Sequence, residues 1–162
     1  MEFFWNPNDR GVEIYSSRGA NGIDGILSTA LGIAHRGKPT YLLTGDLALL
    51  HDSNGGLISK KLEGSLTIIL VNNAGGGIFE MLPVSQLGEA FETYFATDQQ
   101  IDFSKWAATY DIEYAKANSL KELETHLGRE ARKGVNLIEV VTDRKRDAAE
   151  RKRIFAEIAS SL

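Results

Sequence analysis

The sequence predicts an α/β fold, with a doubly wound and mainly parallel sheet flanked by helices. Two observations carry this prediction: short apolar runs end at Gly or Asn, and stretches with helical periodicity alternate with these runs. The 162 residues are enough for one well-cored domain and too few for two of ordinary size. No internal repeat or interdomain linker interrupts them. We therefore expect a single domain over residues 1–162.

The predicted strands are short apolar runs bounded by turn-forming residues. In chain order they cover residues 12–15, 41–44, 66–71, 113–115 and 137–141.

Two helices are predicted in the first half of the chain. Apolar residues spaced three and four apart from Ile26 to Ala34 predict a helix, and Gly37 and Pro39 end it. A second helix is expected over residues 48–61.

Two further helices are predicted in the second half. Ser119 and Glu122 form a capping box ahead of an apolar stripe that continues to Ala131. Residues 154–162 carry the stripe of an amphipathic C-terminal helix. The basic run 144–146 is interpreted as a solvated helix face.

Residues 74–100 form the irregular part of the sequence. They begin with a glycine triplet, which lets the backbone approach a ligand closely, and continue to the aromatic residues Phe91, Tyr94 and Phe95. This combination is typical of an active-site loop.

Composition excludes several classes of function. The chain has 18 Lys and Arg against 22 Asp and Glu, and the net charge of −4 gives no general attraction to nucleic acid. It has no cysteine, which excludes disulfides and cysteine-based zinc sites. We assign no catalytic role to His35, His51 or His126. Neither a membrane span nor a secretory signal is predicted, so we expect a soluble, cytoplasmic protein.

Oxygen-bearing side chains follow two of the predicted strands. Gly45 and Asp46 come directly after residues 41–44, and Asn73 follows residues 66–71. Ligands of parallel sheets bind at the carboxyl ends of strands, and Mg²⁺ prefers carboxylate and amide oxygens. Asp46 and Asn73 are therefore candidate magnesium ligands. Taken alone, Asp46 would more simply cap the helix that follows it.

Backbone N–H groups at the start of that helix, and in the loop over residues 74–77, can bind a diphosphate without basic side chains.

Three ordered sequence blocks carry a family resemblance. Residues 15–25 read YSSRGANGIDG, residues 45–47 read GDL, and residues 72–79 read NNAGGGIF, followed by Leu82 and Pro83. The second and third blocks resemble the magnesium and diphosphate motif of thiamine-diphosphate enzymes. Together the blocks resemble the C-terminal, diphosphate-binding domain of the 2-succinyl-5-enolpyruvyl-6-hydroxy-3-cyclohexene-1-carboxylate (SEPHCHC) synthase family of menaquinone and phylloquinone biosynthesis.

The resemblance implies a cofactor and a set of site residues. Thiamine diphosphate would bind together with Mg²⁺, which Mn²⁺ can replace, and the metal ligands would be Asp46, Asn73 and the backbone carbonyl of Gly75. Implied cofactor contacts also include Ile23, Gly45, Leu47, Gly76, Ile78 and Phe79. Implied substrate contacts are Arg18, Phe79 and Leu82. Leu47 stands where many thiamine enzymes carry Gly, and SEPHCHC synthases tend to carry Leu there.

Each implied role has a physical basis. Ile23 would support the bent conformation of the cofactor, although on its own it would be an ordinary core residue. Ile78, Phe79 and Leu82 would form an apolar wall that favours decarboxylation. The planar guanidinium of Arg18 suits the carboxylates of the implied substrates, 2-oxoglutarate and isochorismate.

The resemblance also implies what lies outside this chain. Family subunits have three domains, and a glutamate on the pyrimidine-binding domain of a partner subunit activates the cofactor. We therefore expect a C-terminal fragment that is inactive alone, from an enzyme that is a homodimer or homotetramer. Two alternatives stay open: another thiamine-diphosphate-dependent enzyme, either a 2-oxo acid decarboxylase or one resembling acetohydroxyacid synthase, or a non-catalytic diphosphate-binding assembly module.

Overall fold

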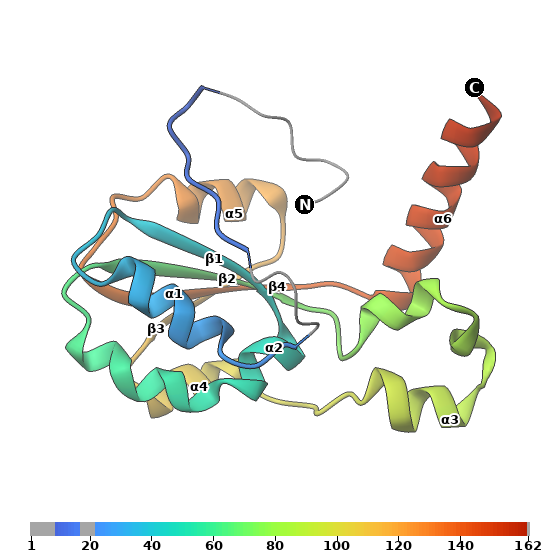
Figure 1. The fold of residues 1–162 in the computed structure, drawn as a ribbon, viewed down its shortest axis with the longest axis horizontal. Helices are drawn as coiled ribbons and strands as arrows, with labels where there is room; N and C mark the ends of the chain where they lie inside the picture. The colour runs from blue at the N-terminus through green and yellow to red at the C-terminus, as the bar shows by residue number, and fades with distance from the viewer. Residues whose placement is uncertain (1–8, 17–21, 162) are drawn as a thin grey trace.

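A four-stranded parallel sheet organises the chain. The computed structural model describes residues 9–16 and 22–161, and within them the strand order is β1-β2-β4-β3 (Figure 1). The strands are β1 Thr40–Gly45, β2 Ser65–Asn72, β3 Glu113–Ala117 and β4 Gly134–Val141. The predictions for residues 41–44, 66–71, 113–115 and 137–141 are confirmed. The predicted α/β fold with a mainly parallel sheet is confirmed as well.

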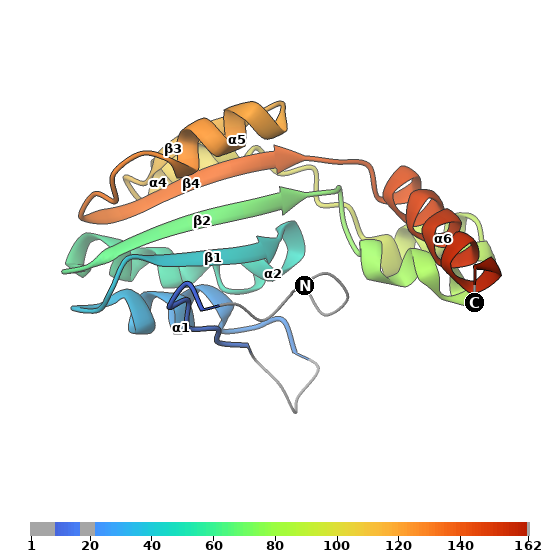
Figure 2. The same cartoon turned by 90° about the horizontal axis from the view of Figure 1, so that it is seen from above.

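Helices cover both faces of this sheet, as parallel strands joined by crossovers require. One face carries α1 Ile26–Ala34, the 3₁₀ helix η1 Ser53–Lys61 and α4 Phe103–Thr109, and α5 Leu120–Leu127 lies on the other (Figures 1 and 2). The short helix α2 Asp46–His51 starts directly where β1 ends.

The main hydrophobic core lies between β2 and the face covered by α1. Leu66, Ile68 and Leu70 alternate along β2, so they point to one side of the sheet, and all are fully buried. They pack in one cluster with Leu27 and Leu31 of α1. The rigid end of β2 that results is where the candidate site begins.

The segment over residues 12–15, predicted as a strand, is not one in the structure. Residues 11–16 have no regular secondary structure and pair with no strand of the described chain. Val12 and Ile14 are 59% and 46% exposed, and Glu13 forms an ion pair of 3.0 Å with Lys38. Apolar composition alone does not make a strand where no neighbouring strand offers its hydrogen bonds.

The helix predicted over residues 48–61 is divided in two. Asp52 separates α2 from η1, and its carboxylate accepts hydrogen bonds from the backbone N–H and the hydroxyl of Ser28, at 2.6 and 2.9 Å. In η1, a Cβ atom on Gly56 would lie 2.6 Å from the ring of Tyr110. Contacts with other elements therefore set the path of this segment.

The prediction of Ser119 as a helix cap is confirmed, but the return bond of the predicted capping box goes to Asn118 and not to Ser119. The Ser119 hydroxyl accepts from the N–H of Glu122 at 3.2 Å, while the Glu122 carboxylate accepts from the N–H of Asn118 at 2.9 Å. The helix ends at Leu127, so Ala131 lies outside it.

The C-terminal helix is longer than predicted. α6 Arg144–Ser160 begins ahead of residue 154, with Asp143 as its N-cap. The interpretation of residues 144–146 as a solvated face is wrong for Arg144, whose side chain is only 11% exposed because it faces two glutamates. None of the described helices is long and apolar enough to span a membrane.

An irregular lobe connects β2 to α4 at the carboxyl end of the sheet, and α6 packs against it (Figures 1 and 2). We call residues 74–100 the lobe. Its helical turns are η2 Gly77–Met81, η3 Pro83–Gln86, α3 Glu89–Phe91 and the π-helix η4 Glu92–Ala96. The prediction of an irregular segment is confirmed.

Candidate metal centre

Asp46 is a buried carboxylate at the end of β1. It is the first residue of α2 and is 6% exposed, and Gly45 occupies the N-cap position. The reading of Asp46 as the helix cap is therefore wrong. Its Oδ2 atom instead accepts a 2.7 Å hydrogen bond from the backbone N–H of Gly75, across from β1 to the segment after β2.

Burial raises the pKa of the Asp46 carboxyl above the usual value for Asp. The hydrogen bond from Gly75 lowers the pKa and so opposes burial, whereas the negative charge of Asp98 raises it further. An opposite charge favours the ionised form of a carboxyl group. A cation bound beside Asp46 would therefore stabilise the form that this environment disfavours.

Asn73 is a second oxygen-bearing residue at a strand end. It follows the last residue of β2, and its Oδ1 atom is buried without a hydrogen-bond partner among the described residues. An unsatisfied buried acceptor costs about 1–3 kcal/mol. A hard cation at this point would remove that cost, because it binds amide oxygens directly.

The glycines that follow Asn73 let the backbone lie close to neighbouring atoms of the chain. Gly75 has φ +119°, and a Cβ atom there would lie 2.1 Å from the carbonyl oxygen of Ala96. A Cβ atom on Gly76 would lie 2.3 Å from the carbonyl oxygen of Phe95, and one on Gly77 would lie 2.4 Å from Nδ2 of Asn73. Only glycine fits positions 75 and 76 without a shift of the lobe, whereas a side chain at position 77 would displace the Asn73 side chain.

The three implied metal ligands share one donor chemistry. Asp46, Asn73 and the carbonyl of Gly75 all offer oxygen, at the ends of two neighbouring strands. The Gly75 carbonyl accepts from the N–H of Gly77 at 2.8 Å, and a carbonyl has a second lone pair for a metal. The described residues contain no cluster of three or more His, Cys, Asp or Glu. These residues fit Mg²⁺ or Mn²⁺ better than a zinc-type ion.

The loop amides that the sequence suggested for diphosphate binding are engaged within the chain. The N–H of Gly76 donates to Ala96 at 2.7 Å and that of Ala74 donates to Oδ1 of Asn72 at 3.3 Å. The N–H groups of Gly75 and Gly77 are used in the bonds described above. A diphosphate at these amides would have to compete with those bonds.

Sequence reasoning missed a buried carboxylate on β4. Glu139 of β4 is 6% exposed and accepts a 2.6 Å hydrogen bond from Nδ2 of Asn72 and another from the hydroxyl of Tyr114. Burial, followed by the bond to Glu139, raises the pKa of Tyr114. One indication of this residue was present in the sequence, because Glu139 is the single charged residue in the apolar run 137–141. Because Asn72 also accepts a hydrogen bond from the N–H of Ala74, this network supports the turn that follows β2.

The apolar residues implied in cofactor and substrate binding are largely exposed. Ile23, Ile78 and Leu82 are 40%, 73% and 49% exposed, so Ile23 is not a core residue. Phe79 is half-buried and packs edge-to-face with Phe95, with ring centroids 5.8 Å apart. Arg18 lies outside the described residues.

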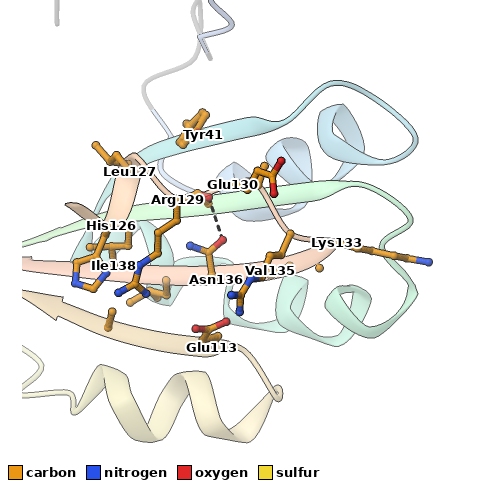
Figure 3. Close-up of a pocket in the computed structure, with 16 residues that line it drawn as sticks. Tyr41, Glu113, His126, Leu127, Arg129, Glu130, Lys133, Val135, Asn136 and Ile138 are labelled. Carbon is orange, nitrogen blue, oxygen red and sulfur yellow. Dashed lines mark hydrogen bonds between the residues drawn. The ribbon is translucent and has the colours of Figure 1, made fainter. Parts of the chain in front are cut away.

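Of two hollows in the structure, one lies beside Asp46 and the other lies away from the predicted site residues. A cavity of about 200 Å³ lies beside Asp46, between Asn72 at the end of β2 and Asp98 in the lobe. Another hollow, shown in Figure 3, lies between the strands and the segment from α5 to β4, near Arg129 and Asn136. None of the predicted site residues lines it, and we assign it no function.

The fold and this donor set define a thiamine-diphosphate-binding domain. Residues 5–140 match the family described as "Thiamine pyrophosphate enzyme, C-terminal TPP binding domain", and the chain belongs to this family.

Curated relatives of the chain are named 2-succinyl-5-enolpyruvyl-6-hydroxy-3-cyclohexene-1-carboxylate synthase. The Rippkaea orientalis protein is 51% identical over 161 residues, which cover 99% of this chain and 27% of the relative. The Trichodesmium erythraeum protein is 53% identical over 148 residues, which cover 91% of this chain and 25% of the relative. The chain thus spans about a quarter of the length of these relatives.

Solved structures show the same fold at lower identity. Benzoylformate decarboxylase from Polynucleobacter necessarius has a TM-score of 0.61 at 21% identity, covering 73% of this chain and 23% of that one. A thiamine-diphosphate-dependent 4-hydroxybenzoylformate decarboxylase from Rhodococcus jostii RHA1 has a TM-score of 0.50 at 21% identity, covering 64% and 19%.

Proposed function

We propose that this chain is the metal- and diphosphate-binding portion of a SEPHCHC synthase. The whole enzyme would decarboxylate 2-oxoglutarate and add the remaining succinyl unit to isochorismate, in menaquinone or phylloquinone biosynthesis. The observation that carries the proposal is that buried Asp46 follows β1 while the unpartnered Oδ1 of Asn73 follows the neighbouring strand β2. This arrangement stands in a chain 51% identical to one such synthase.

Asp46, Asn73 and the Gly75 carbonyl would hold Mg²⁺, and the metal would neutralise most of the charge of the diphosphate. This division of work suits a chain with a net charge of −4, because no cluster of basic side chains is needed. When bound, thiamine diphosphate supplies the electron sink that decarboxylation of a 2-oxo acid requires.

The remaining site residues would act on the substrates. Arg18 would bind a substrate carboxylate through its planar fork. The exposed side chains of Ile78 and Leu82 would cover the reacting atoms and exclude water once substrate is bound. The isolated chain would lack the glutamate that activates the cofactor, which belongs to the pyrimidine-binding domain of a partner subunit in a homodimer or homotetramer.

The test is product analysis with the full-length protein. With thiamine diphosphate, Mg²⁺, 2-oxoglutarate and isochorismate, mass spectrometry should detect SEPHCHC, whereas the 162-residue chain alone should release no CO₂. A full-length protein that decarboxylates benzoylformate or pyruvate but not 2-oxoglutarate would contradict the proposal and favour the other decarboxylases. Cofactor binding without any turnover would favour a non-catalytic assembly module.

A further inference from the structure

Arg144 points from the start of α6 back to the segment that follows β2. Its Nε atom donates to the carbonyl oxygen of Ala74 at 3.3 Å. Its two terminal nitrogens pair with the carboxylates of Glu80 and Glu92. The side chain is only 11% exposed, and its guanidinium carbon lies 6.0 Å from the centre of the Phe91 ring. All four partners belong to the lobe.

The charges around Arg144 are matched on both elements. Glu80 is 10% exposed at its side chain, so its charge depends on Arg144 for compensation. The Glu92 carboxylate also forms an ion pair with Nζ of Lys145 at 2.7 Å. Nζ of Lys152 donates to the backbone carbonyl of Glu80 at 3.1 Å. The first half of α6 therefore holds the lobe at several points, with Arg144 as the most buried of them.

One of these contacts is at the metal centre itself. Ala74 lies between Asn73 and Gly75, two of the candidate ligands, and it has φ +61°, which a residue other than glycine adopts at a cost. Such a conformation persists where surrounding contacts hold it, and the bond from Arg144 to the Ala74 carbonyl is one of them. Arg144 thus acts on the turn that sets the relative placement of two metal-binding oxygens.

We propose that Arg144 is a positioning residue for the metal centre. Through the Ala74 carbonyl, Glu80 and Glu92 it keeps residues 73–75 in the conformation that presents the Asn73 and Gly75 oxygens together. Its effect on metal affinity rests on the proposed function, whereas its effect on the order of the turn does not. Charge patterning gave no sign of this role, because the partners of Arg144 lie in a distant part of the sequence.

The test compares Arg144→Ala with two control variants of the same region. Arg153→Ala removes an exposed arginine of α6 that pairs with Glu150 and Glu157 of its own helix. Asp143→Ala removes the N-cap of α6 and weakens the helix, but leaves the guanidinium of Arg144 in place. Arg144→Lys keeps the charge and loses the fork, so it should recover only part of the effect.

Amide hydrogen exchange of the 162-residue chain without metal provides the first measurement. The N–H groups of Gly75 and Gly76, bonded to Asp46 and Ala96, should exchange at least 10-fold faster in Arg144→Ala. They should stay unchanged in Arg153→Ala. Equal exchange in Arg144→Ala and the parent, or the same increase in Asp143→Ala, would overturn the proposal.

The second measurement is the affinity of the full-length protein for Mn²⁺ in the presence of thiamine diphosphate. Electron paramagnetic resonance reports the free and bound Mn²⁺. Arg144→Ala should weaken Mn²⁺ binding at least 10-fold and Arg144→Lys by less, with both controls unchanged. Faster exchange with unaltered Mn²⁺ affinity would overturn the positioning role. If the full-length parent protein bound no Mn²⁺ with thiamine diphosphate, the metal centre itself would be wrong, while the exchange data would still decide whether Arg144 orders the turn. Should Arg144→Ala not fold, Glu92→Gln, at a partly exposed partner, carries the same test.

Discussion

The backbone N–H of Gly75 donates a 2.7 Å hydrogen bond to Oδ2 of Asp46, and so joins the segments that follow β1 and β2. Both groups are buried, so neither has water as an easy alternative partner. The bond fixes Gly75 relative to Asp46 before any metal arrives. The fold therefore fixes two of the three candidate ligand residues relative to each other, and several measurements can test the site.

The first prediction concerns the charge of Asp46. Asp46→Asn keeps an oxygen that can accept from Gly75, but it removes a negatively charged ligand from the metal. The variant should fold, and its affinity for Mg²⁺ with thiamine diphosphate should fall at least 10-fold, or about 1.4 kcal/mol. Calorimetry on the full-length protein measures this. Unchanged cofactor affinity in folded Asp46→Asn or Asp46→Ala protein would remove Asp46 from the site.

The second prediction concerns the space around Gly75. A Cβ atom there would meet the Ala96 carbonyl oxygen at 2.1 Å and would also be strained at φ +119°. Gly75→Ala should lower the free energy of unfolding by about 2–6 kcal/mol, since strain and overpacking each cost about 1–3 kcal/mol.

Gly88→Ala is the matched control for that substitution. Gly88 also has a positive φ, of +58°, but a Cβ atom there would meet no described atom within 4 Å. Gly88→Ala should cost only the backbone strain of this unusual conformation, about 1–3 kcal/mol. Urea unfolding of both variants would show whether contact with Ala96, rather than φ alone, requires glycine at position 75. Equal losses would contradict this account.

The third prediction concerns the hydrogen bond from the half-buried Tyr114 to the buried Glu139. Tyr114→Phe leaves one Glu139 oxygen without its donor, and should lower the free energy of unfolding by about 1–3 kcal/mol near neutral pH. Tyr94→Phe, at a side chain that is 76% exposed, should have little effect.

The pH dependence of that difference follows from the raised pKa of Tyr114. The folded chain holds the phenol proton to higher pH than the unfolded chain, so folding loses stability as pH rises between the two pKa values. The advantage over Tyr114→Phe should therefore be complete below about pH 10, the ordinary tyrosine value, and decrease above it. A difference independent of pH up to 11.5 or so would be inconsistent with ionisation of a hydrogen-bonded phenol.

The fourth prediction concerns Arg18 and rests on the family resemblance. In the full-length enzyme, Arg18→Ala should lower kcat/KM by an amount equal to roughly 1.5–3 kcal/mol, the scale of a charge-assisted hydrogen bond, with cofactor affinity nearly intact. Lys at this position should restore activity only in part, because the fork is lost. Arg36→Ala, at an exposed arginine paired with Glu63, is the control. Equal activity of Arg18→Ala and the parent would refute the substrate role.

Much of the fold could be predicted because its signals are local. Apolar runs such as residues 66–71 form central strands whose side chains are covered on both faces, and Ser119 forms its cap with a residue three positions away. The prediction for residues 12–15 failed because a strand needs a neighbour, which sequence periodicity does not show. The helix over residues 48–61 was divided because Asp52 bonds to Ser28 of another helix.

The candidate site could be predicted only in part, because the sequence shows local signals and not contacts between distant residues. Asp46 and Asn73 could be proposed because strand ends and residue types are readable locally. The buried state of Arg144 could not, since Glu80 and Glu92 lie more than fifty positions away along the chain. Long-range pairs of this kind depend on the completed fold.

The central claim is that three oxygens at the ends of β1 and β2 bind one metal ion. Anomalous diffraction near the manganese absorption edge, from crystals of the protein grown with Mn²⁺ and thiamine diphosphate, tests it most directly. We expect one Mn²⁺ ion within about 2.0–2.4 Å of an Asp46 carboxylate oxygen, Oδ1 of Asn73 and the carbonyl oxygen of Gly75. An anomalous peak elsewhere, or an ion bound by Asp98 without Asn73, would contradict the account.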